Sequence, residues 1–567
     1  MCGIFALLNN SEHSEEIIQN EFKKGENRGP EFSKLDNSFN SLILGFHRLA
    51  INGLNNESNQ PLIIDNVVLI CNGEIYNYKQ LYKYMNITPK TESDCEAIIH
   101  LYIKYGIEQT LTMLDGVYSF ILLDNRSPAK NLYVARDPFG VRPLYYLSTK
   151  NSSHTNNMFG FASELKCLQY FYNTMPEVYS IEQFEPGTYS KFNLNTESVS
   201  ESKSLSWNLI NKNIRHFIPS FSYSLLINKS NQFVIKSMME NISNHLNSAV
   251  IKRCFTTERP IACLLSGGLD SSLITTLVNN YYRKNDKDFQ IETYSIGLKD
   301  SEDLKYAKIV ADYLKTKHTE IIVTEDDMFN AIPEVIYAIE SYDTTSVRAS
   351  IGNYLLGKYI AKNSTAKVIF NGDGSDELFG GYLYMNKCPD DIEFDKETRR
   401  LLKDIHLFDV LRSDKSISSH GLEPRTPFLD RTFVNHILTI PPYFRNHKNI
   451  NECEKYLLRS AFVKENVLNF EKQALLPDEI LWRKKEAFSD GVSGHGRSLF
   501  QILQDKIALK LDMFSNIETE KHYYKQIFDN AYPNCSHILP YFWMPKYTDA
   551  TDPSARTLVF YSDDKKS

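Results

Sequence analysis

The residue best suited to nucleophilic chemistry stands at the second position of the chain. The sequence opens Met1-Cys2-Gly3-Ile4-Phe5, so removal of Met1 would leave Cys2 with a free α-amino group beside its thiol. An α-amino group has an ordinary pKa of about 7.7 to 8.0, close to the value that suits a general base at neutral pH. Cys2 would then supply both a nucleophile and the base that activates it.

A glycine-containing segment much further along predicts a phosphate-binding loop. Ser266-Gly267-Gly268-Leu269-Asp270-Ser271-Ser272 follows the apolar run 261–265 and precedes apolar residues at helical spacing. Such a loop brings backbone N–H groups and the positive end of a helix to an anion. The Lys-Ser/Thr pair of a Walker loop is missing, which favours a pyrophosphate that departs from an adenylate. The alternative is a plain Gly-Gly turn, which an acid and two serines at this spacing disfavour.

A second loop is rich in carboxylates. Asn371-Gly372-Asp373-Gly374-Ser375-Asp376-Glu377 follows the short apolar run 368–370. Mg²⁺ prefers one or two protein carboxylates together with substrate phosphates, and we predict Asp270 and Asp376 as its two ligands. The alternative is a solvated acidic turn. If both loops follow parallel strands, they meet at the carboxyl edge of one sheet, where ligands bind.

The first third of the chain holds polar residues that suit an oxyanion and an amino acid. Asn72-Gly73 ends an apolar run and offers a side-chain amide and a backbone N–H, the two donors of an oxyanion hole. Arg48 and Asp94 could hold the carboxylate and the amine of an amino acid. The alternatives are a turn at Asn72-Gly73 and surface ion pairs at Arg48 and Asp94.

The elements that must position these groups differ between the two halves. Up to about residue 190 the sequence predicts sheet layers with helices, with strands at 42–46, 67–71, 118–123 and 132–135 and a helix at 95–105. The polar stretch 193–212 suits a solvated connection. After residue 233, strands at 261–265, 291–296, 321–323 and 368–370 alternate with helical patterns. We predict an α/β fold with a doubly wound parallel sheet in this second half, and a mostly helical remainder after about 401.

Bulk composition excludes several classes of protein. The chain of 567 residues has 63 Lys+Arg against 70 Asp+Glu, a net charge of −7, and no long basic block, so nucleic acid is not expected as a partner. No apolar run reaches the ~18 residues of a membrane span, and the opening segment does not suit a signal peptide. We therefore expect a cytoplasmic protein without a membrane partner. Nine cysteines without a CxxC pair favour core positions over a zinc site or a disulfide framework.

Taken together, these motifs resemble the glutamine-hydrolysing asparagine synthetase family of class II glutamine amidotransferases, over nearly the whole chain. The matching segments of this sequence are Met1-Cys2-Gly3-Ile4-Phe5, Arg28-Gly29-Pro30, His47-Arg48-Leu49, Asn72-Gly73-Glu74-Ile75-Tyr76-Asn77, Ala135-Arg136-Asp137-Pro138-Phe139-Gly140, 266–272, Tyr342-Asp343, Arg348-Ala349-Ser350, His420-Gly421-Leu422-Glu423, Pro427-Phe428-Leu429-Asp430, Trp482-Arg483, Lys485-Glu486-Ala487-Phe488-Ser489-Asp490-Gly491, Trp543-Met544-Pro545-Lys546 and 550–557.

The resemblance implies an N-terminal-nucleophile (αββα) glutaminase domain at 1–190, a connecting segment at 191–232, and a PP-loop ATP pyrophosphatase-like synthetase domain with a parallel sheet at 233–567. The implied ligase hydrolyses glutamine at one site. At the other it forms an aspartyl adenylate from aspartate and ATP with Mg²⁺, and ammonia attacks that adenylate. The implied substrates are aspartate, glutamine and ATP, and a homodimer is implied as possible because dimers are common in the family.

Residue by residue, the resemblance assigns roles to the matching positions. Cys2 is the implied nucleophile, with Asn72 and Gly73 as oxyanion donors. Glutamine is implied to bind at Arg48, Leu49, Ala50, Ile51, Asn52, Asn72, Gly73, Glu74 and Asp94. ATP is implied at Leu265, Ser266, Gly267, Gly268, Asp270, Ser271, Ser272, Ile296, Asn371 and Gly372, with Mg²⁺ on Asp270 and Asp376. The adenylate and pyrophosphate are implied to meet Thr345, Ser346, Arg348 and Lys485, of which Arg348 and Lys485 are also implied as catalytic.

One departure from the family pattern bears on the second reaction. The family usually has Ser-Gly-Glu-Gly-Ser-Asp-Glu in the second loop, where this chain has Asn371 and Asp373. The carboxylate implied to assist ammonia attack is shorter by one methylene, and a ~1 Å misplacement can cost on the order of 10²-fold in rate. Asn52-Gly53, where the family often has an acidic residue, is a smaller departure. Two alternatives stay open: the same chemistry on a different acceptor acid, or a catalytically weakened regulator that binds glutamine or ATP.

Overall fold

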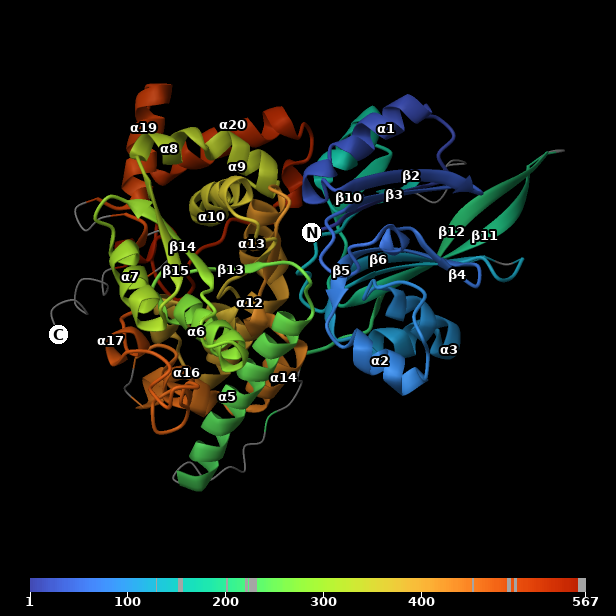
Figure 1. Cartoon of the computed structure of the whole chain (residues 1–567). Helices are drawn as coiled ribbons and strands as arrows, with labels where there is room; N and C mark the ends of the chain where they lie inside the picture. The colour runs from blue at the N-terminus through green and yellow to red at the C-terminus, as the bar shows by residue number, and fades with distance from the viewer. Residues whose placement is uncertain are drawn as a thin grey trace. The chain divides into compact units, whose positions relative to one another are not determined.

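The computed structural model describes residues 1–128, 130–150, 157–199, 202–219, 223, 232–450, 453–486, 491–493 and 497–558. These residues form two units (Figure 1). The first unit holds Met1–Ile218, Ser418–Leu422 and Phe528–Ile538, and the second holds Pro219–Ile417, Glu423–Ile527 and Leu539–Ser567.

Two antiparallel six-stranded sheets form the frame of the first unit. One sheet has the order β10-β8-β9-β1-β3-β2, with strands β1 (Gly3–Leu8), β2 (Phe32–Phe39), β3 (Leu42–Arg48), β8 (Tyr145–Thr149), β9 (Phe159–Ala162) and β10 (Tyr179–Gln183). The other has the order β12-β11-β7-β6-β5-β4, with strands β4 (Leu62–Ile64), β5 (Val67–Ile75), β6 (Gly116–Asp124), β7 (Asn131–Arg136), β11 (Thr188–Val199) and β12 (Ser202–Arg215). The strands predicted at 42–46, 67–71, 118–123 and 132–135 lie within β3, β5, β6 and β7.

Alternation along the strands explains how these sheets are stacked. Successive residues of a strand point to opposite faces. On β5, Val68 and Ile70 pack into a core shared with Ile4 and Phe46 of the other sheet. Leu69 and its neighbours at alternate positions pack instead with residues of the helices α2 (Tyr78–Met85) and α3 (Glu96–Met113). Every position of the centre of β5 is therefore buried on one face or the other.

Helices also cover the outer face of the other sheet. Phe5 of β1 lies 5.9 Å, centroid to centroid, from Phe22 of α1 (Glu15–Lys23) and 6.3 Å from Phe171 of α4 (Gln169–Thr174). Gly45 of β3 makes room for this packing, because a β-carbon there would lie 2.7 Å from the Phe22 ring. The layers of the first unit are thus helix, sheet, sheet, helix, the αββα arrangement that the resemblance implied.

The second unit is built on a parallel sheet. Its order is β15-β14-β13-β16-β17, with strands β13 (Ile261–Leu264), β14 (Glu292–Leu298), β15 (Lys317–Val323), β16 (Val368–Phe370) and β17 (Glu423–Arg425), and every neighbouring pair is parallel. Four of these strands were predicted from the sequence, and β17 was not. The order reverses direction around β13, so the crevice beyond the carboxyl ends of β13 and β16 is the expected place for a ligand.

Helices flank this sheet and make up most of the described structure up to Ala531. In Figure 1, α6 (Leu269–Asn285) and α7 (Glu302–Leu314) lie along one side of the strands and α10 (Thr344–Asn363) along the other. The other α-helices among the described residues after Gln232 are α5 (Gln232–Phe255), α8 (Glu325–Asn330), α9 (Ile332–Ile339), α11 (Ser375–Phe379), α12 (Asp391–Asp404), α13 (Asp409–Ser418), α14 (Arg431–Thr439), α15 (Pro442–Arg445), α16 (Tyr456–Ala461), α17 (Asp478–Leu481), α19 (Leu499–Leu511) and α20 (Ile517–Ala531).

The polar stretch interpreted as a solvated connection has a different structure. Residues 193–199 and 202–212 belong to the antiparallel strands β11 and β12, and β11 also pairs with β7. Phe192, Leu194 and Trp207 are buried in the core between the sheets. The stretch interpreted as a solvated connection is therefore paired into the sheet in its described part, because Phe192 and Leu194 at alternate positions of β11 and Trp207 of β12 dock an otherwise polar pair of strands.

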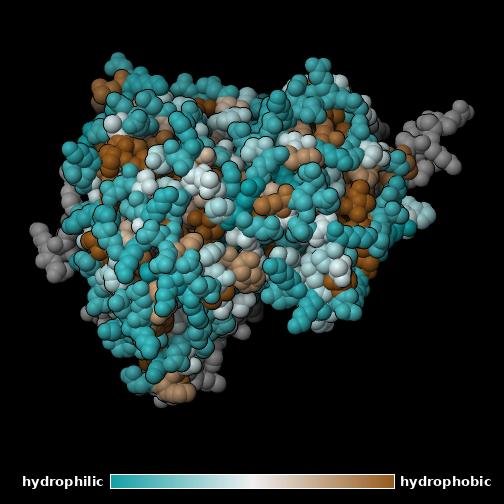
Figure 2. Space-filling model, viewed as in Figure 1, coloured by the Kyte–Doolittle hydropathy of each residue, from teal (hydrophilic) through white to brown (hydrophobic). Residues whose placement is uncertain are grey.

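Further observations concern the surface and the cysteines. Hydrophilic residues cover most of the face shown in Figure 2, and the hydrophobic ones lie in small groups. No helix in the described ranges is long and apolar enough to cross a membrane. Seven of the nine cysteines are buried, as predicted for small core residues, and Cys2 and Cys453 are half-buried.

Candidate active sites

Cys2 stands at the head of β1, where the backbone is held on both sides. Its Sγ lies 3.7 Å from the carbonyl oxygen of Leu49, within the limit for a sulfur hydrogen bond. The guanidinium of Arg28 donates from Nε to the Cys2 carbonyl at 3.0 Å and from Nη1 to Glu164 Oε1 at 2.8 Å. Arg28 is itself buried, so the pair with Glu164 fixes the position of the residue that carries the thiol.

The predicted oxyanion donors are on the neighbouring sheet and are linked to Cys2 through Ser163. Asn72 is fully buried on β5, and its Nδ2 donates to Ser163 Oγ at 3.3 Å. The same hydroxyl accepts from the backbone N–H of Ile4 at 3.1 Å, two residues after Cys2. Gly73 follows, where a β-carbon would lie 2.6 Å from the Val117 carbonyl oxygen, so β6 approaches too closely for any other residue. Ser163 was missed in the sequence because nothing local marks it.

The residues predicted to bind glutamine gather around the end of β5. Asn52 donates from Nδ2 to Glu74 Oε2 at 2.7 Å, and both side chains are buried. Asp94 accepts from the backbone N–H of Ile75 at 2.6 Å. Arg48 donates to the carbonyl of Asn55 at 2.9 Å, and also to Asn59 and to the backbone of Gly53. The guanidinium thus supports the loop that carries the other predicted contacts, Leu49, Ala50, Ile51 and Asn52.

The second unit has a cavity of about 200 Å³ at the carboxyl edge of its sheet. Many predicted residues line it: Leu265, Ser266, Gly268, Asp270, Ser271, Ile296, Thr345, Asn371, Gly372, Asp373, Asp376 and Lys485. Gly267 and Ser272 are not in this lining. Gly267 has φ +72° and lies against α7, where a β-carbon would be 2.4 Å from the Ala307 nitrogen. Ser272 is buried in the first turn of α6. The two glycine loops therefore meet in one cavity, as predicted from their places after parallel strands.

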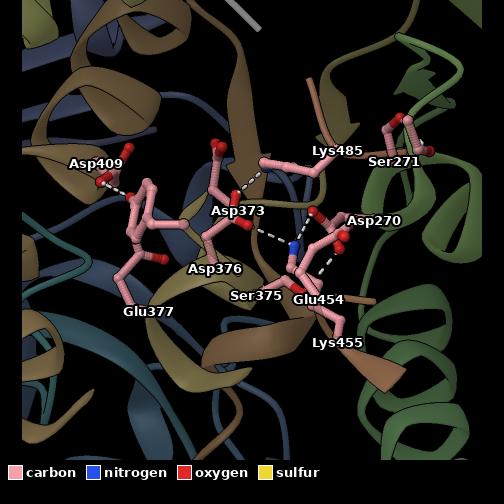
Figure 3. Close-up of polar contacts among 12 residues, drawn as sticks. Asp270, Ser271, Asp373, Ser375, Asp376, Glu377, Asp409, Glu454, Lys455 and Lys485 are labelled. Atoms are coloured by element: carbon pink, nitrogen blue, oxygen red, sulfur yellow. Dashed lines mark hydrogen bonds and ion pairs between the residues drawn. The ribbon is translucent and has the colours of Figure 1, made fainter. Parts of the chain in front are cut away.

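Lys455 bridges Asp270 and Asp376, and Lys485 pairs with Asp376 (Figure 3). Lys455 Nζ lies 2.5 Å from Asp270 Oδ2 and 2.6 Å from Asp376 Oδ1. Lys485 Nζ is paired with the other oxygen of Asp376. Burial acts against the charged form of Asp376, but Lys455 and Lys485 outweigh it and lower the pKa of this carboxyl. Burial likewise acts against the charged form of Lys485, and Asp376 and Asp270 outweigh it and raise its pKa. Both groups stay ionised at neutral pH.

Asp373 lies beside a cluster of charged groups. Its Oδ1 is 3.4 Å from Arg412 Nη2, and Arg412 also donates from Nε to Asp409 Oδ1 at 2.8 Å. Burial raises the pKa of Asp373, and the nearby Asp409 and Asp376 carboxylates add to the rise while Arg412 opposes it. A carboxyl with a raised pKa is suited to accept a proton from an attacking amine.

Of the remaining predicted contacts, only Thr345 faces the cavity. Ser346 donates from its backbone and its hydroxyl to Asp343 Oδ2, both at 2.8 Å, so it belongs to the N-terminal cap of α10. Arg348 is buried and makes paired contacts with Glu520 and Asp552 near the end of the chain, with Nη1 2.7 Å from Asp552 Oδ1. The structure does not bring Ser346 or Arg348 into the cavity with Lys485.

Several polar residues of the cavity were not predicted from the sequence. Tyr382 follows the second glycine loop closely, and the others come from loops and helices further along the chain from either loop: Asp303, Asp409, Arg412, Lys455, Arg459, Arg483 and Lys484. The only signal was the family resemblance at Trp482-Arg483 and Lys485, because an isolated lysine or arginine in a helical region is indistinguishable from a surface charge.

The fold and the two sites define a class of protein. A thiol at the head of an αββα sandwich characterises an N-terminal-nucleophile amidotransferase unit, and a glycine loop with paired carboxylates on a parallel sheet characterises a nucleotide-using synthetase unit. Comparisons with known proteins agree on both halves. The family described as glutamine amidotransferase domain matches residues 1–200, and the family described as asparagine synthase matches residues 241–393 and 386–548.

Full-length relatives show the family itself. The chain is 39% identical to the glutamine-hydrolysing asparagine synthetase of Bos taurus over 99% of both chains, and 38% identical to that of Homo sapiens over 100% of both. The Gallus gallus relative is 39% identical over 99% of both. A solved structure, NMN synthetase from Francisella tularensis, matches 55% of this chain at 11% identity. Its TM-score of 0.23 is too low to support a conclusion about the fold. The chain belongs to the family of glutamine-hydrolysing asparagine synthetases.

Proposed function

We propose that this chain makes asparagine from aspartate, with ATP as the energy source and glutamine as the nitrogen donor. The observation that carries the proposal is the cavity of the second unit, where Asp270, Asp376 and Lys485 meet the phosphate-binding loop. The family membership and the Cys2 site of the first unit give the nitrogen donor. We also propose the domain division, with a glutaminase domain that ends near residue 218 instead of 190, because β11 and β12 belong to its sheet.

At the first site, the Cys2 thiolate attacks the side-chain amide carbon of glutamine. Asn72 and Gly73 donate hydrogen bonds to the oxyanion that forms, and the amide nitrogen leaves as ammonia with the proton taken from the thiol. Water then hydrolyses the thioester to glutamate and restores the thiol. The α-amine of Cys2 is the proposed base, which requires removal of Met1. Arg48, Asn52, Glu74 and Asp94 are proposed to hold the substrate or the loop around it.

At the second site, an oxygen of the aspartate side-chain carboxylate attacks the α-phosphorus of ATP and pyrophosphate leaves. Ammonia then attacks the acyl carbon, AMP leaves, and asparagine forms. The backbone N–H groups of loop 266–272 are proposed to bind phosphate. Lys485 is proposed to balance the charge of the leaving pyrophosphate, and Asp373 to take a proton from the attacking ammonia.

Mg²⁺ fits the residues present. Asp376 Oδ1 is a buried carboxylate oxygen. It is ion-paired with Lys455, but none of the described residues donates a hydrogen bond of good geometry to it. Asp270 and Asp376 would hold the ion, and phosphate oxygens of the nucleotide would complete its preference for hard ligands. When bound, Mg²⁺ supplies positive charge that stabilises the departing pyrophosphate.

The test is a mass-spectrometric product assay with ATP, Mg²⁺, aspartate and either glutamine or ammonium, on the wild type and on Cys2→Ala. We expect asparagine, AMP and pyrophosphate from both donors in the wild type and from ammonium alone in the variant. Absence of asparagine from both donors, in a folded protein that binds ATP, would overturn the proposal in favour of another acceptor acid or a regulator.

The family resemblance also supports a homodimer and a cytoplasmic location as proposals. Light scattering after size exclusion should give twice the mass of one chain, which is 65.5 kDa. Cell fractionation should place the activity in the cytosol. A monomer, or activity confined to an organelle, would contradict the respective proposal.

A further inference from the structure

Lys455 occupies the space between the two carboxylates proposed to bind metal. Its Nζ donates to Asp270 Oδ2 at 2.5 Å and is ion-paired with Asp376 Oδ1 at 2.6 Å. Only 1% of its side chain is exposed. Figure 3 shows the ammonium aimed between the two aspartates, which come from the first turns of α6 and α11. Neither glycine loop contains this lysine, which lies 185 positions after Asp270.

The local backbone is built to place this ammonium. Lys455 has φ 58° and ψ 24°, the left-handed region, at the start of α16. This conformation is strained for a residue with a β-carbon, and the surroundings of Lys455 hold it there. Gly381 clears the path of the side chain, since a β-carbon there would lie 2.1 Å from Lys455 Cε and 2.2 Å from Asp376 Oδ1. The left-handed backbone of Lys455 and the missing side chain of Gly381 thus both allow the Lys455 ammonium to lie at this position.

The other oxygens of the pair have their own fixed partners. Ser375 Oγ donates to Asp270 Oδ1 at 2.8 Å, and Lys485 is paired with Asp376 Oδ2. The oxygens that face one another, Asp270 Oδ2 and Asp376 Oδ1, are the two that Lys455 contacts. A divalent cation between these two oxygens would need the same space as the ammonium, because Mg²⁺ binds carboxylate oxygens at about 2.0–2.1 Å.

We propose that Lys455 is a positioning residue that holds Asp270 and Asp376 together and competes with a divalent cation for their facing oxygens. This inference rests on the proposed metal site. The cation alone must displace a buried ammonium and therefore binds weakly. A cation that arrives with a polyphosphate brings an anion to which the released ammonium can turn, because Lys455 lines the same cavity. Lys455 thereby couples cation binding to nucleotide binding.

The test measures Mn²⁺ binding to the full-length protein without nucleotide, by the loss of the free-ion electron paramagnetic resonance signal. Lys455→Met removes the ammonium and keeps an unbranched side chain of similar length. We expect it to bind Mn²⁺ at least about tenfold more tightly than the wild type, because two facing carboxylates lose their competitor. The matched control is Lys484→Met, which removes one positive charge from the same cavity lining and should change Mn²⁺ affinity less than threefold.

Two further variants keep the inference falsifiable. Lys455→Arg retains the charge and should keep Mn²⁺ binding weak, whether or not Lys455→Met folds well. Asp270→Asn in the Lys455→Met background should abolish the gain and so locate the ion. Unchanged or weaker Mn²⁺ binding by folded Lys455→Met, or equal gains in Lys484→Met, would overturn the competition.

The outcomes separate this inference from the proposed function. Wild-type asparagine formation without any Mn²⁺ gain in Lys455→Met would refute the competition alone. A Mn²⁺ gain in a protein that makes no asparagine would refute the proposed function and leave the competition standing.

Discussion

Gly372 rests directly on the backbone of Asp270. A β-carbon at Gly372 would lie 2.8 Å from both the carbonyl carbon and the Cβ of Asp270, and 2.8 Å from the nitrogen of Ser271. Glycine therefore allows the second loop to lie against the first, and this contact sets the separation of the two groups of carboxylates in the cavity.

We expect Gly372→Ala to push the loops apart, since the neighbouring atoms are backbone and have little freedom to shift. A displacement near 1 Å in a catalytic site can cost on the order of 10²-fold in rate. Ammonia-dependent asparagine formation should fall by about that factor, while glutamine hydrolysis without ATP should change less than twofold. Wild-type kinetics for ATP in this variant would show that the contact is not needed.

Asp373→Glu should accelerate the second reaction. The Asp373 carboxylate is 3.4 Å from Arg412, a loose contact for an ion pair inside a cavity. One added methylene restores the side-chain length usual in the family and extends the carboxylate further from its backbone. We expect a several-fold rise in ammonia-dependent asparagine formation, measured against Asp373→Asn, which should lower it. No gain from Asp373→Glu would mean that the backbone already compensates for the shorter side chain.

Arg348→Met should destabilise the second unit. The side chain is 3% exposed, and its removal would leave the buried Glu520 and Asp552 carboxylates facing one another. Breaking a buried ion pair in this way costs about 3–5 kcal/mol. Thermal unfolding should show a melting temperature several degrees lower, with Arg348→Lys between the variant and the wild type. An unchanged melting temperature together with a raised KM for aspartate would return Arg348 to the substrate-binding role implied by the resemblance.

Asp303 should make stability depend on pH between about 4 and 7. Burial raises the pKa of this carboxyl to about 7, and Arg483, 3.0 Å away, opposes the rise. The folded chain holds the proton while the unfolded chain, with an ordinary pKa near 3.9, loses it, so this group lowers the free energy of unfolding as pH rises from 4 to 7. Above pH 7 the effect is constant.

Urea denaturation of the wild type and Asp303→Asn at pH 5, 6, 7 and 8 checks this sign. The stability of the wild type relative to the variant should fall from pH 5 to pH 7 and then level off. A relative stability that rises with pH would show that Arg483 dominates and that the pKa of Asp303 is depressed.

The sequence predicted those elements of the fold that have a recognisable pattern within a few neighbouring residues. The glycine loops and the strands before them were predicted because strand, turn and helix follow one another within a few residues. The pairing of β11 with β12 was missed because Asn, Ser and Lys dominate these strands, and only Phe192 and Leu194 at alternate positions of β11 and Trp207 of β12 show their buried face.

The residues of the candidate site likewise include some that the sequence could predict and some that it could not. Asp270 and Asp376 could be predicted from their loops, whereas Lys455 and Arg412 come from helical regions in which nothing local distinguishes them from surface charges. Their partners are 185 and 39 positions away, and only the folded chain brings them together. For Arg348 the resemblance implied an anionic ligand, and the structure supplies two carboxylates of the chain itself.

The pairing of Arg348 with Asp552 also orders events during synthesis on the ribosome. The two residues are 204 positions apart along the chain. The core around α10 therefore stays incomplete until residue 552 has been synthesised, whereas the pairing of β1 with β3 and of β5 with β6 needs only the first 124 residues. A nascent or prematurely terminated chain would thus have its thiol-bearing sheets assembled while the buried guanidinium still lacked its last partner.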